Sequence, residues 1–310
     1  MYELTIIGGG PAGCGAAVYA ARKRLKSVLI TESFGGQSAG SSEKIENWIG
    51  TVSLSGEEFE NRLREHVNAY ADDALDIKQG VKVTSVSQNS EGKWECITSE
   101  GEELLSETLL YAAGAYRKKL SVPGAKEFEN KGITYCASCD APMFAGQDVA
   151  VIGGGNAGFE TAAQLLNLAN SVTLLHHKKE FKAEPITVEK VSSHPRMTVI
   201  TNAETQKITG DQFVNGLVYK DLETEQTHQL AVNGVFVEIG LKPNTAPLSE
   251  EPKLLDEYGR IKVDPRTQRT AADGLWAAGD CTDGLFHQNN IACGDAIKAL
   301  EDIYMYLKTS

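Results

Sequence analysis

Apolar runs of strand length recur along the chain, and two of them open the same series of features. Leu4–Ile7 and Val149–Ile152 each lead into a glycine-rich turn, and each turn leads into an alanine-rich segment. A second apolar run closes each series, at Ser27–Ile30 and Ser171–Leu175. Strand-length apolar runs that alternate with helical segments are typical of a parallel sheet covered by helices. The pattern predicts an α/β protein with two Rossmann-like nucleotide-binding domains.

The two turns share the spacing Gly-x-Gly-x-x-Gly, at Gly8–Gly13 and Gly153–Gly158. In a dinucleotide site the first glycine makes the tight turn, the second lets the backbone approach a pyrophosphate, and the third lets helix and strand pack closely. The N-terminus of the helix then faces the anion. One such sequence can be an ordinary tight turn, but two in the same context predict two bound dinucleotides. The candidate binding residues of the second turn are Gly153, Gly155, Asn156, Ala157 and Gly158.

The residues after the second strand of each series distinguish the two sites. Glu32 lies 19 residues beyond Gly13, at a position where a carboxylate accepts hydrogen bonds from a ribose. The second series carries the basic run His176–Lys179 and no acid at the corresponding place. A basic cluster suits a 2′-phosphate, so His177 and Lys178 favour NADP over NAD. A solvated surface turn is the alternative interpretation.

Two further apolar strands frame the second series. They end in small or acidic residues that are expected to face the nucleotide crevice of an open α/β sheet, namely Ala113, Gly114, Gly279 and Asp280. The second series lies between these strands, and proline marks both crossings, near Lys118–Pro123 and Gly240–Thr245. We therefore expect an outer domain at about 1–117 plus 243–310, with an inner domain at about 118–242 inserted into it.

Cys136 and Cys139 form a Cys-x-x-Cys sequence just before the glycine turn of the inner domain. Two cysteines at this spacing close a small disulfide ring, and they are typical of redox sites. Asp140 follows directly, and its carboxyl group is a candidate general acid for a departing thiolate. Zinc binding is one alternative, although it requires a second pair of ligands at matching spacing. A pair of inert buried cysteines is the other, but two nucleotide sites supply a source of electrons and favour redox chemistry.

Composition narrows the class of protein further. The 310 residues carry a net charge of -12, and an acidic protein repels phosphate backbones, so we expect no nucleic-acid partner. No apolar run reaches the ~18–20 residues of a membrane span, and no basic leader precedes the first strand. We therefore expect a cytoplasmic protein without a membrane partner. The cysteines outside the close pair are expected to be packing residues, and they are Cys14, Cys96, Cys281 and Cys293.

The joint pattern resembles the low-molecular-weight thioredoxin reductases. It consists, in order, of Gly-x-Gly-x-x-Gly, Gly-Gly-Gln, Glu-Asn-Trp, Cys-x-x-Cys-Asp, Gly-Gly-Gly-Asn and Ala-Gly-Asp, and it extends over essentially the whole chain. It is also similar to the flavoprotein subunit of alkyl hydroperoxide reductase, without the N-terminal domains of that protein. The resemblance implies a homodimer with one FAD in each outer domain. It also implies that the inner domain binds NAD(P)H and carries the redox pair.

The resemblance further implies the roles of individual residues. In this family reduced nicotinamide passes a hydride to the flavin, and the flavin reduces the disulfide. Cys136 would be the exposed attacking thiol, Cys139 the thiol nearer the flavin, and Asp140 the acid. The reduced pair would then exchange with a disulfide of a thioredoxin-like protein. The residues expected to hold FAD are Gly8, Gly10, Pro11, Ala12, Gly13, Glu32, Gly36, Gln37, Asn47, Ala113, Gly114, Gly279, Asp280, Gln288 and Asn289.

Two motifs depart from the family pattern. The nucleotide domain of the family carries His-Arg-Arg-x-x-x-Arg, and the corresponding residues here are His176, His177, Lys178 and Lys182. Lysine lacks the bidentate fork of arginine, so recognition of a phosphate is expected to be weaker or different. The Arg-Gln-Ala sequence near the flavin is replaced by His287-Gln288-Asn289, and a histidine there can titrate near neutral pH.

These features lead to one main hypothesis and three alternatives. The main hypothesis is a thioredoxin-disulfide reductase that uses NADPH and FAD. The first alternative is an NADH-dependent reductase of a peroxiredoxin-linked or glutaredoxin-like protein. The second is a relative that takes electrons from ferredoxin, against which the intact turn at Gly153–Gly158 argues. The third is a flavoprotein without a disulfide substrate, against which the Cys-x-x-Cys sequence argues.

Overall fold

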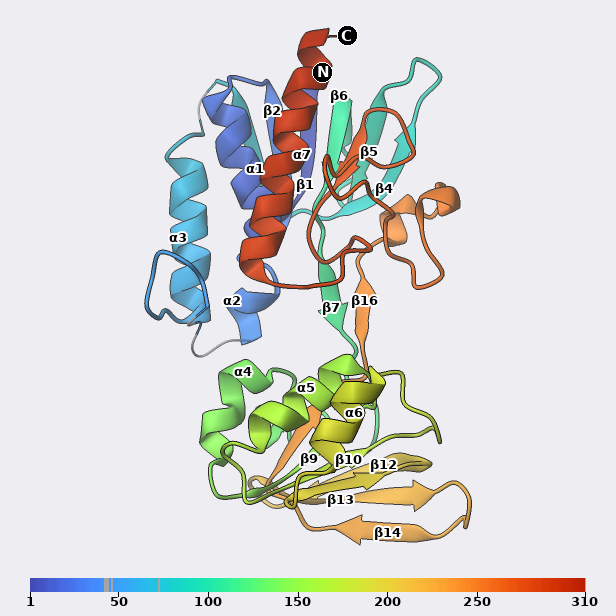
Figure 1. Cartoon of the computed structure of the whole chain (residues 1–310). Coiled ribbons are helices and arrows are strands. Elements are labelled where there is room, and N and C mark those ends of the chain that lie inside the picture. The colour runs from blue at the N-terminus through green and yellow to red at the C-terminus, as the bar shows by residue number, and fades with distance from the viewer. Residues whose placement is uncertain (42–44, 46, 72, 310) are drawn as a thin grey trace. The chain divides into compact units, whose positions relative to one another are not determined.

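The computed structural model describes residues 1–41, 45, 47–71 and 73–309, and at positions 40, 41, 138 and 139 it describes the backbone alone. The chain divides into two compact units, coloured by residue number in Figure 1. The first unit comprises Met1–Tyr116 and Lys242–Ser310, and the second comprises Arg117–Leu241. Each unit is built on a parallel sheet of its own.

The first unit contains a seven-stranded sheet with helices packed on it. Its strands are β1 (Tyr2–Gly9), β2 (Ser27–Phe34), β3 (Leu75–Gln79), β4 (Val83–Gln88), β5 (Trp94–Thr98), β6 (Glu103–Tyr111) and β17 (Leu275–Ala277). Its helices are α1 (Pro11–Arg22), α2 (Gln37–Ser41), α3 (Gly56–Asn68) and α7 (Asn289–Thr309), with short 3-10 turns η2 (Ala246–Leu248) and η3 (Pro252–Leu254). The strand order is β3-β2-β1-β6-β5-β4, and β17 pairs with the end of β6. β5 runs antiparallel to both of its neighbours, β4 and β6. β1, β2, β3, β6 and β17 run parallel to one another.

Alternation along β1 divides the core of this unit between the two faces of the sheet. Leu4 and Ile6 are buried with the alanines of α1 and with α7, which lie side by side on one face (Figure 1). Ile7 points to the other face, where it joins a cluster that includes Trp94 and Tyr111. Because successive side chains of a strand point to opposite faces, one apolar run supplies both layers.

The second unit contains a five-stranded parallel sheet of order β11-β10-β9-β15-β8 and a three-stranded antiparallel sheet of order β12-β13-β14. The parallel strands are β8 (Ile133–Thr134), β9 (Asp148–Ile152), β10 (Ser171–Leu175), β11 (Met197–Ile200) and β15 (Gly234–Val237). The antiparallel strands are β12 (Ala203–Gly210), β13 (Val214–Asp221) and β14 (Thr227–Leu230). The helices are α4 (Ala137–Asp140), η1 (Ala141–Phe144), α5 (Asn156–Leu165) and α6 (Pro185–Ser192). Two short strands, β7 (Ala115–Arg117) and β16 (Leu241–Pro243), pair with each other where the chain passes between the units.

Both faces of the second parallel sheet are covered. Val149 and Val151 of β9 pack under α5 with Phe159. Ala150 and Ile152 of the same strand pack on the opposite face, in a cluster with residues of β12 and β13. The antiparallel sheet therefore takes the place that helices occupy on the second face of a doubly wound fold.

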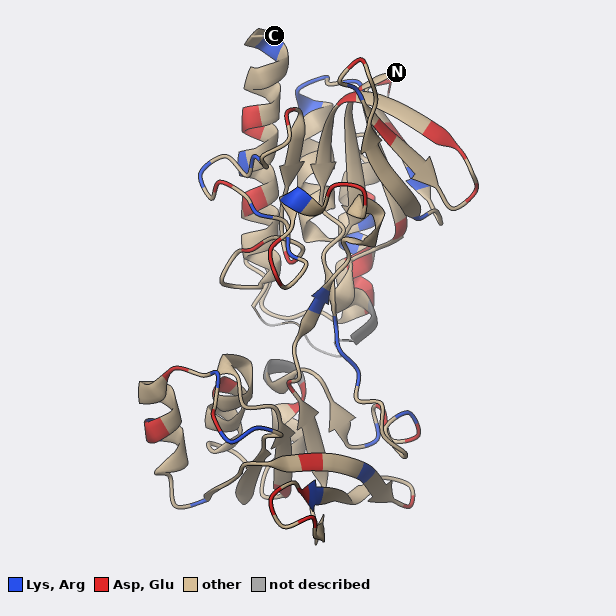
Figure 2. Ribbon diagram, turned by 90° about the vertical axis from the view of Figure 1, so that its right-hand side faces the viewer, with Lys and Arg blue, Asp and Glu red and all other residues tan. Residues whose placement is uncertain are grey.

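The strand orders of the two units show the same pattern. β3-β2-β1-β6 in the first unit corresponds to β11-β10-β9-β15 in the second. The predicted fold class, two Rossmann-like α/β domains of which the second is inserted into the first, is confirmed. Figure 2 shows Lys and Arg residues interspersed with Asp and Glu residues over both units. No described helix has the length and apolarity that a bilayer crossing requires.

Candidate functional site

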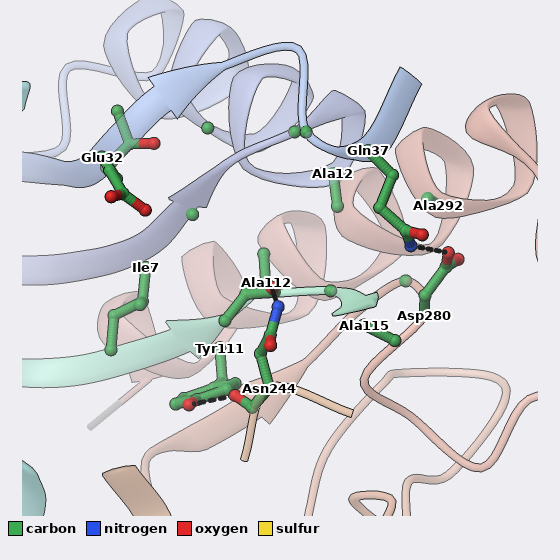
Figure 3. Close-up of a pocket in the computed structure, with 18 of the residues that line it drawn as sticks. Ile7, Ala12, Glu32, Gln37, Tyr111, Ala112, Ala115, Asn244, Asp280 and Ala292 are labelled. Carbon is green, nitrogen blue, oxygen red and sulfur yellow. Dashed lines mark hydrogen bonds between the residues drawn. The ribbon is translucent and has the colours of Figure 1, made fainter. Parts of the chain in front are cut away.

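A cavity of about 510 Å³ opens at the carboxyl ends of β1 and β6 (Figure 3). This is the switch point of the first sheet, because the strand that follows β1 in the chain lies on one side of it and β6 lies on the other. Open α/β sheets bind nucleotides at such a point. The volume falls in the range of cofactor sites. All residues that line the cavity belong to the first unit.

The first glycine turn forms the floor of this cavity. Gly8 has φ +113°, and a Cβ there would lie 2.3 Å from the carbonyl oxygen of Ala112. A Cβ on Gly13 would lie 1.7 Å from the carbonyl oxygen of Gly8, so a larger residue would force α1 away from β1. A Cβ on Gly10 would meet only the Cα of Gly36, at 3.8 Å, which leaves its backbone open to a ligand. No side chain caps the N-terminus of α1, so its backbone N–H groups are suited to a phosphate.

Polar groups mark the two ends of the cavity in Figure 3. Glu32 lies at one end, and its Oε1 is 3.1 Å from Nζ of Lys82. Asp280 lies at the other end, where its Oδ2 accepts a hydrogen bond of 3.3 Å from Nε2 of Gln37. Ala12, which belongs to the first glycine turn, lies between these ends in Figure 3. A dinucleotide has the same sequence of groups, with a hydroxylated sugar on either side of a pyrophosphate, so the residues present fit such a cofactor.

Most of the predicted FAD residues line this cavity. They are Gly8, Gly10, Pro11, Ala12, Glu32, Gly36, Gln37, Ala113, Gly114, Gly279, Asp280 and Asn289. Gly13 lies behind the turn, where it supports helix packing. Asn47 and Gln288 contact each other instead, through a 3.0 Å hydrogen bond from Nδ2 of Asn47 to Oε1 of Gln288. The structure thus brings twelve of the fifteen predicted positions to one cavity.

The polar lining residues that were not among the sequence predictions include Lys82, Tyr111 and Asn244. Lys82 pairs with Glu32 across one end of the cavity. The hydroxyl of Tyr111 donates to the carbonyl oxygen of Asn244 at 2.7 Å, and Nδ2 of Asn244 donates to the carbonyl oxygen of Ala113 at 2.8 Å. Asn244 thereby holds the second crossing against the end of β6. The only sequence signal for it was its place in the proline-marked crossing.

The second glycine turn lies at the equivalent switch point, between β9 and β15. Gly155 is the N-cap of α5, and no side chain caps this helix either. The basic run is tied to the turn by backbone contacts. The N–H of Lys182 donates to the carbonyl oxygen of Gly154 at 3.1 Å, and the N–H of Glu184 donates to Oδ1 of Asn156 at 2.9 Å. The basic residues therefore lie beside the turn that is expected to hold a pyrophosphate.

The histidines of this run have different environments. His176 is 5% exposed, and a Cβ on Gly154 would lie 2.5 Å from its ring. Its Nε2 lies 3.0 Å from the carbonyl oxygen of Glu180, and the ring also contacts Phe181. Burial lowers the pKa of His176, so it is neutral and serves packing rather than phosphate binding. His177 is exposed, as the proposed contact with a nucleotide requires.

Lysines dominate the exposed part of this segment. Lys178, Lys179 and Lys182 are exposed. Among the residues that the structure describes, no carboxylate forms an ion pair with any of the three. Cations that lack a carboxylate partner beside a helix N-terminus form a suitable place for a phosphate.

The redox segment follows β8 in the second unit. Cys136 is half-buried and disulfide-bonded. The side chain of Cys139, its predicted partner, lies outside the described part of the chain. The hydroxyl of Thr134 donates a hydrogen bond to Oδ2 of Asp140. Oγ1 of Thr134 also accepts a hydrogen bond of 3.2 Å from the N–H of Cys136. Thr134 was not among the predicted site residues, because a threonine that ends an apolar strand has no distinctive sequence signal.

The other cysteines have no such environment. Cys14, Cys96 and Cys281 are fully buried, and burial raises the pKa of each to about 12. Burial also raises the pKa of Cys293. A thiol with such a pKa carries almost no thiolate near neutral pH, and the thiolate is the reactive form. In the described residues no group of three or more His, Cys, Asp or Glu side chains is arranged to hold a metal ion.

Comparison with known proteins assigns the class. Residues 2–296 match the pyridine nucleotide-disulphide oxidoreductase family, and the chain belongs to this family. The family implies an oxidoreductase with FAD and a nicotinamide nucleotide as cofactors.

Particular relatives carry more than one name. The structure is similar to thioredoxin reductase from Giardia duodenalis, with TM-score 0.85 and 30% identity over 99% of each chain, which confirms the predicted resemblance. The sequence is 40% identical over 306 residues to a protein named NADH dehydrogenase from Bacillus subtilis. It is 37% identical to a Staphylococcus aureus protein that is named as a subunit of alkyl hydroperoxide reductase. Each match covers 99% of this chain but only 58% and 59% of those two relatives.

Proposed function

We propose that this chain is an NADPH-dependent disulfide reductase that passes electrons through FAD and the Cys136–Cys139 pair to a thioredoxin-like protein. The observation that carries the proposal is the disulfide-bonded Cys136 in the same compact unit as the second glycine turn. A dithiol pair beside a nucleotide site suits electron transfer between a nicotinamide and a protein disulfide. We further propose the first unit as the FAD domain and the second as the NADPH domain.

The cavity of the first unit is the proposed FAD site. The turn at Gly8–Gly13 and the N-terminus of α1 would bind the pyrophosphate, and Glu32 would accept hydrogen bonds from the adenosine ribose. Asp280, held by Gln37, would contact the ribityl chain at the other end. When bound, FAD accepts a hydride from the nicotinamide and supplies two electrons. The role of the chain here is to orient the cofactor and to hold its charge.

The proposed donor is NADPH because lysines that pair with no carboxylate in the described part of the chain lie beside the second glycine turn. His177, Lys178 and Lys182 would bind the 2′-phosphate that distinguishes NADPH from NADH. The test compares flavin bleaching by the two nucleotides in anaerobic stopped flow. Replacing Lys178 and Lys182 with Ala should raise the KM for NADPH about tenfold or more and leave that for NADH within about twofold. Lys207→Ala, on the antiparallel sheet of the same unit, is the matched control.

Two results would count against this donor. Equal bleaching by both nucleotides, unaffected by the lysine variants, would show that the basic segment is a solvated surface. Preference for NADH would favour the second candidate function, which is reduction of a peroxiredoxin-linked protein with NADH. That candidate has specific support, because one of the relatives above is named NADH dehydrogenase and another is named for alkyl hydroperoxide reductase.

The proposed exit of electrons is thiol–disulfide exchange at Cys136. Its thiolate would attack a disulfide of the partner, and Cys139 would then attack Cys136 to release the reduced partner. Cys139→Ser should abolish turnover with oxidised thioredoxin while FAD stays bound. Unchanged turnover would remove the disulfide route. Candidate thioredoxins and glutaredoxin-like proteins, assayed in parallel, identify the partner class. The proposed homodimer rests on the family resemblance and is tested by light scattering.

A further inference from the structure

Thr134 ends the outermost strand of the second parallel sheet. It pairs in register with Phe236 of β15, and both residues are buried. A side chain at this place has little freedom, because its backbone belongs to the sheet and its neighbours are packed. Only Tyr135 separates it from Cys136 of the redox segment. The sheet can therefore hold the Thr134 hydroxyl in a fixed position relative to that segment.

The hydroxyl of Thr134 joins two groups of the redox segment. It donates to Oδ2 of Asp140, and it accepts the N–H of Cys136 at 3.2 Å. The N–H of Asp140 in turn donates to the carbonyl oxygen of Cys136 at 3.1 Å. These three bonds connect strand, cysteine and carboxylate in one closed set. Asp140 is thus held by hydrogen bonds at both its backbone N–H and its carboxylate.

We propose that Thr134 is a positioning residue that holds the Asp140 carboxyl group for proton transfer to the sulfur that leaves during disulfide exchange. The inference rests on the proposed function, and it deepens it by naming the group that fixes the acid. A hydroxyl has one donor and two acceptor sites. While it accepts the N–H of Cys136, it donates to the ionised carboxylate, and it can accept from the protonated acid by rotation. Both protonation states of Asp140 are therefore held in the same place.

The chemical step balances without a further reactant. The thiolate of Cys136 attacks one sulfur of the partner disulfide, a new sulfur–sulfur bond forms, and the old one breaks. The leaving sulfur takes both electrons of the broken bond and receives the proton of Asp140. The Cys139 thiol loses its proton to water and attacks Cys136, which closes the enzyme disulfide and releases the second partner sulfur as a thiolate. The two electrons that the partner gains are those that the enzyme dithiol loses, and Asp140 regains a proton from water.

The test uses two disulfides that differ in their need for an acid. The aryl disulfide DTNB releases an acidic thiol that departs unprotonated. Bis(2-hydroxyethyl) disulfide instead releases an alkyl thiolate, which is more basic and benefits from a proton as it leaves. FAD-loaded protein, fully reduced with dithionite under anaerobic conditions, is mixed rapidly with each compound. Release of thionitrobenzoate reports the first reaction, and return of oxidised flavin reports the second. Dithionite removes any dependence on the nucleotide donor.

Thr134→Val keeps the shape of the residue and removes the hydroxyl, whereas Thr134→Ser keeps the hydroxyl. We expect Thr134→Val to lower the rate with the alkyl disulfide about tenfold or more relative to the rate with DTNB. Thr134→Ser should restore the wild-type ratio of the two rates. Asp140→Asn should show the same selective loss, and adding Thr134→Val to it should cause no further change in the ratio, because both act through one proton.

Several outcomes would overturn the inference. A Thr134→Val protein that loses both rates by the same factor has suffered a general structural defect. A protein that loses neither does not need the hydroxyl. Failure of Thr134→Ser to restore the ratio would show that the methyl group, not the hydroxyl, is required. A wild-type protein that reduces neither compound would refute the proposed disulfide reductase, and the inference with it, which distinguishes that failure from the others.

Discussion

The buried carboxylate of Glu238 offers a sharp test of how the second unit is stabilised. It follows β15 at the switch point of the sheet, and its side chain is 9% exposed. Nη1 of Arg117 lies 3.1 and 3.3 Å from its two oxygens, and the hydroxyl of Thr161 on α5 donates to Oε1 at 3.0 Å. Burial raises the pKa of Glu238, and the Arg117 guanidinium opposes that rise. Arg117→Met removes the only cation of this set and retains much of the side-chain volume.

The loss of stability expected for Arg117→Met follows from the buried charge of Glu238 that would be left without its cation. Loss of one partner of a fully buried ion pair costs about 3–5 kcal/mol. Arg117 is 40% exposed, so water reaches one side of the pair and we expect about 2–3 kcal/mol. Glu238→Gln keeps an acceptor for Thr161 and leaves no buried carboxylate, while Arg117 keeps its contact with water, so this variant should cost only about 1 kcal/mol. In the Glu238→Gln background, Arg117→Met should cost about 1 kcal/mol or less, because no charge remains to be compensated.

The dependence on pH gives a second signature. Without Arg117, the folded-state pKa of Glu238 lies further above the unfolded value of about 4.3. The folded state then binds more protons than the unfolded state between those two pKa values, so stability rises as the pH falls through this window. Arg117→Met should therefore be less destabilised at pH ~5.5 than at pH ~7.5. The Glu238→Gln variants should not show this recovery.

Hydrogen exchange at increasing urea concentration is the suitable assay. The tryptophans, Trp48, Trp94 and Trp276, all lie in the first unit, so fluorescence does not report on the second. Peptides from α5 and β15 give the free energy of opening of the second unit directly. Arg117→Met would contradict this reasoning if it lowered the free energy of opening equally with Glu238 and with Gln at that position, or equally at both pH values. Either result would show that Arg117 does not compensate the buried charge of Glu238.

Three further predictions concern the glycine turns and the thiols. Gly13→Ala should prevent stable folding of the first unit, because its Cβ would overlap the carbonyl oxygen of Gly8. Gly10→Ala should fold, but its affinity for FAD should fall by about tenfold or more. Measurements of flavin content and thermal unfolding distinguish the two outcomes. Since burial lowers the pKa of His176, stability should fall as the pH drops below ~6.5 toward the folded-state pKa, and His176→Gln should reduce this loss in the same exchange assay. After reduction at pH ~8, iodoacetamide should modify Cys136 and leave the buried thiols unmodified in mass spectra, namely Cys14, Cys96 and Cys281.

Local patterns predicted the fold well, and long-range packing decided what they missed. The apolar run Ser171–Leu175 coincides with β10, because a short buried strand consists of consecutive apolar residues and is visible in the local sequence. Asn244 and Lys82 reach the first cavity from segments distant in sequence from its glycine turn, so no local spacing marks them. Thr134 was missed for a different reason, because a threonine that ends a strand has no distinctive sequence signal. Its hydrogen bond to Asp140, six residues further on, follows from the strand–helix geometry.

The register of the two sheets identifies the residue that supports each glycine turn. Ile7 of β1 pairs with Ile30, and Ile152 of β9 pairs with Leu175, so Thr31 and His176 are equivalent positions. Each packs against the middle glycine of its turn, since a Cβ on Gly9 would meet Oγ1 of Thr31 at 2.4 Å and a Cβ on Gly154 would meet the ring of His176 at 2.5 Å. The next residue in each chain segment is exposed, and it is Glu32 in one unit and His177 in the other. The basic run in the sequence begins at His176, but the register shows that this residue supports the turn. On the proposed function, discrimination between a free ribose and a phosphorylated one would fall to His177 and to the lysines after it.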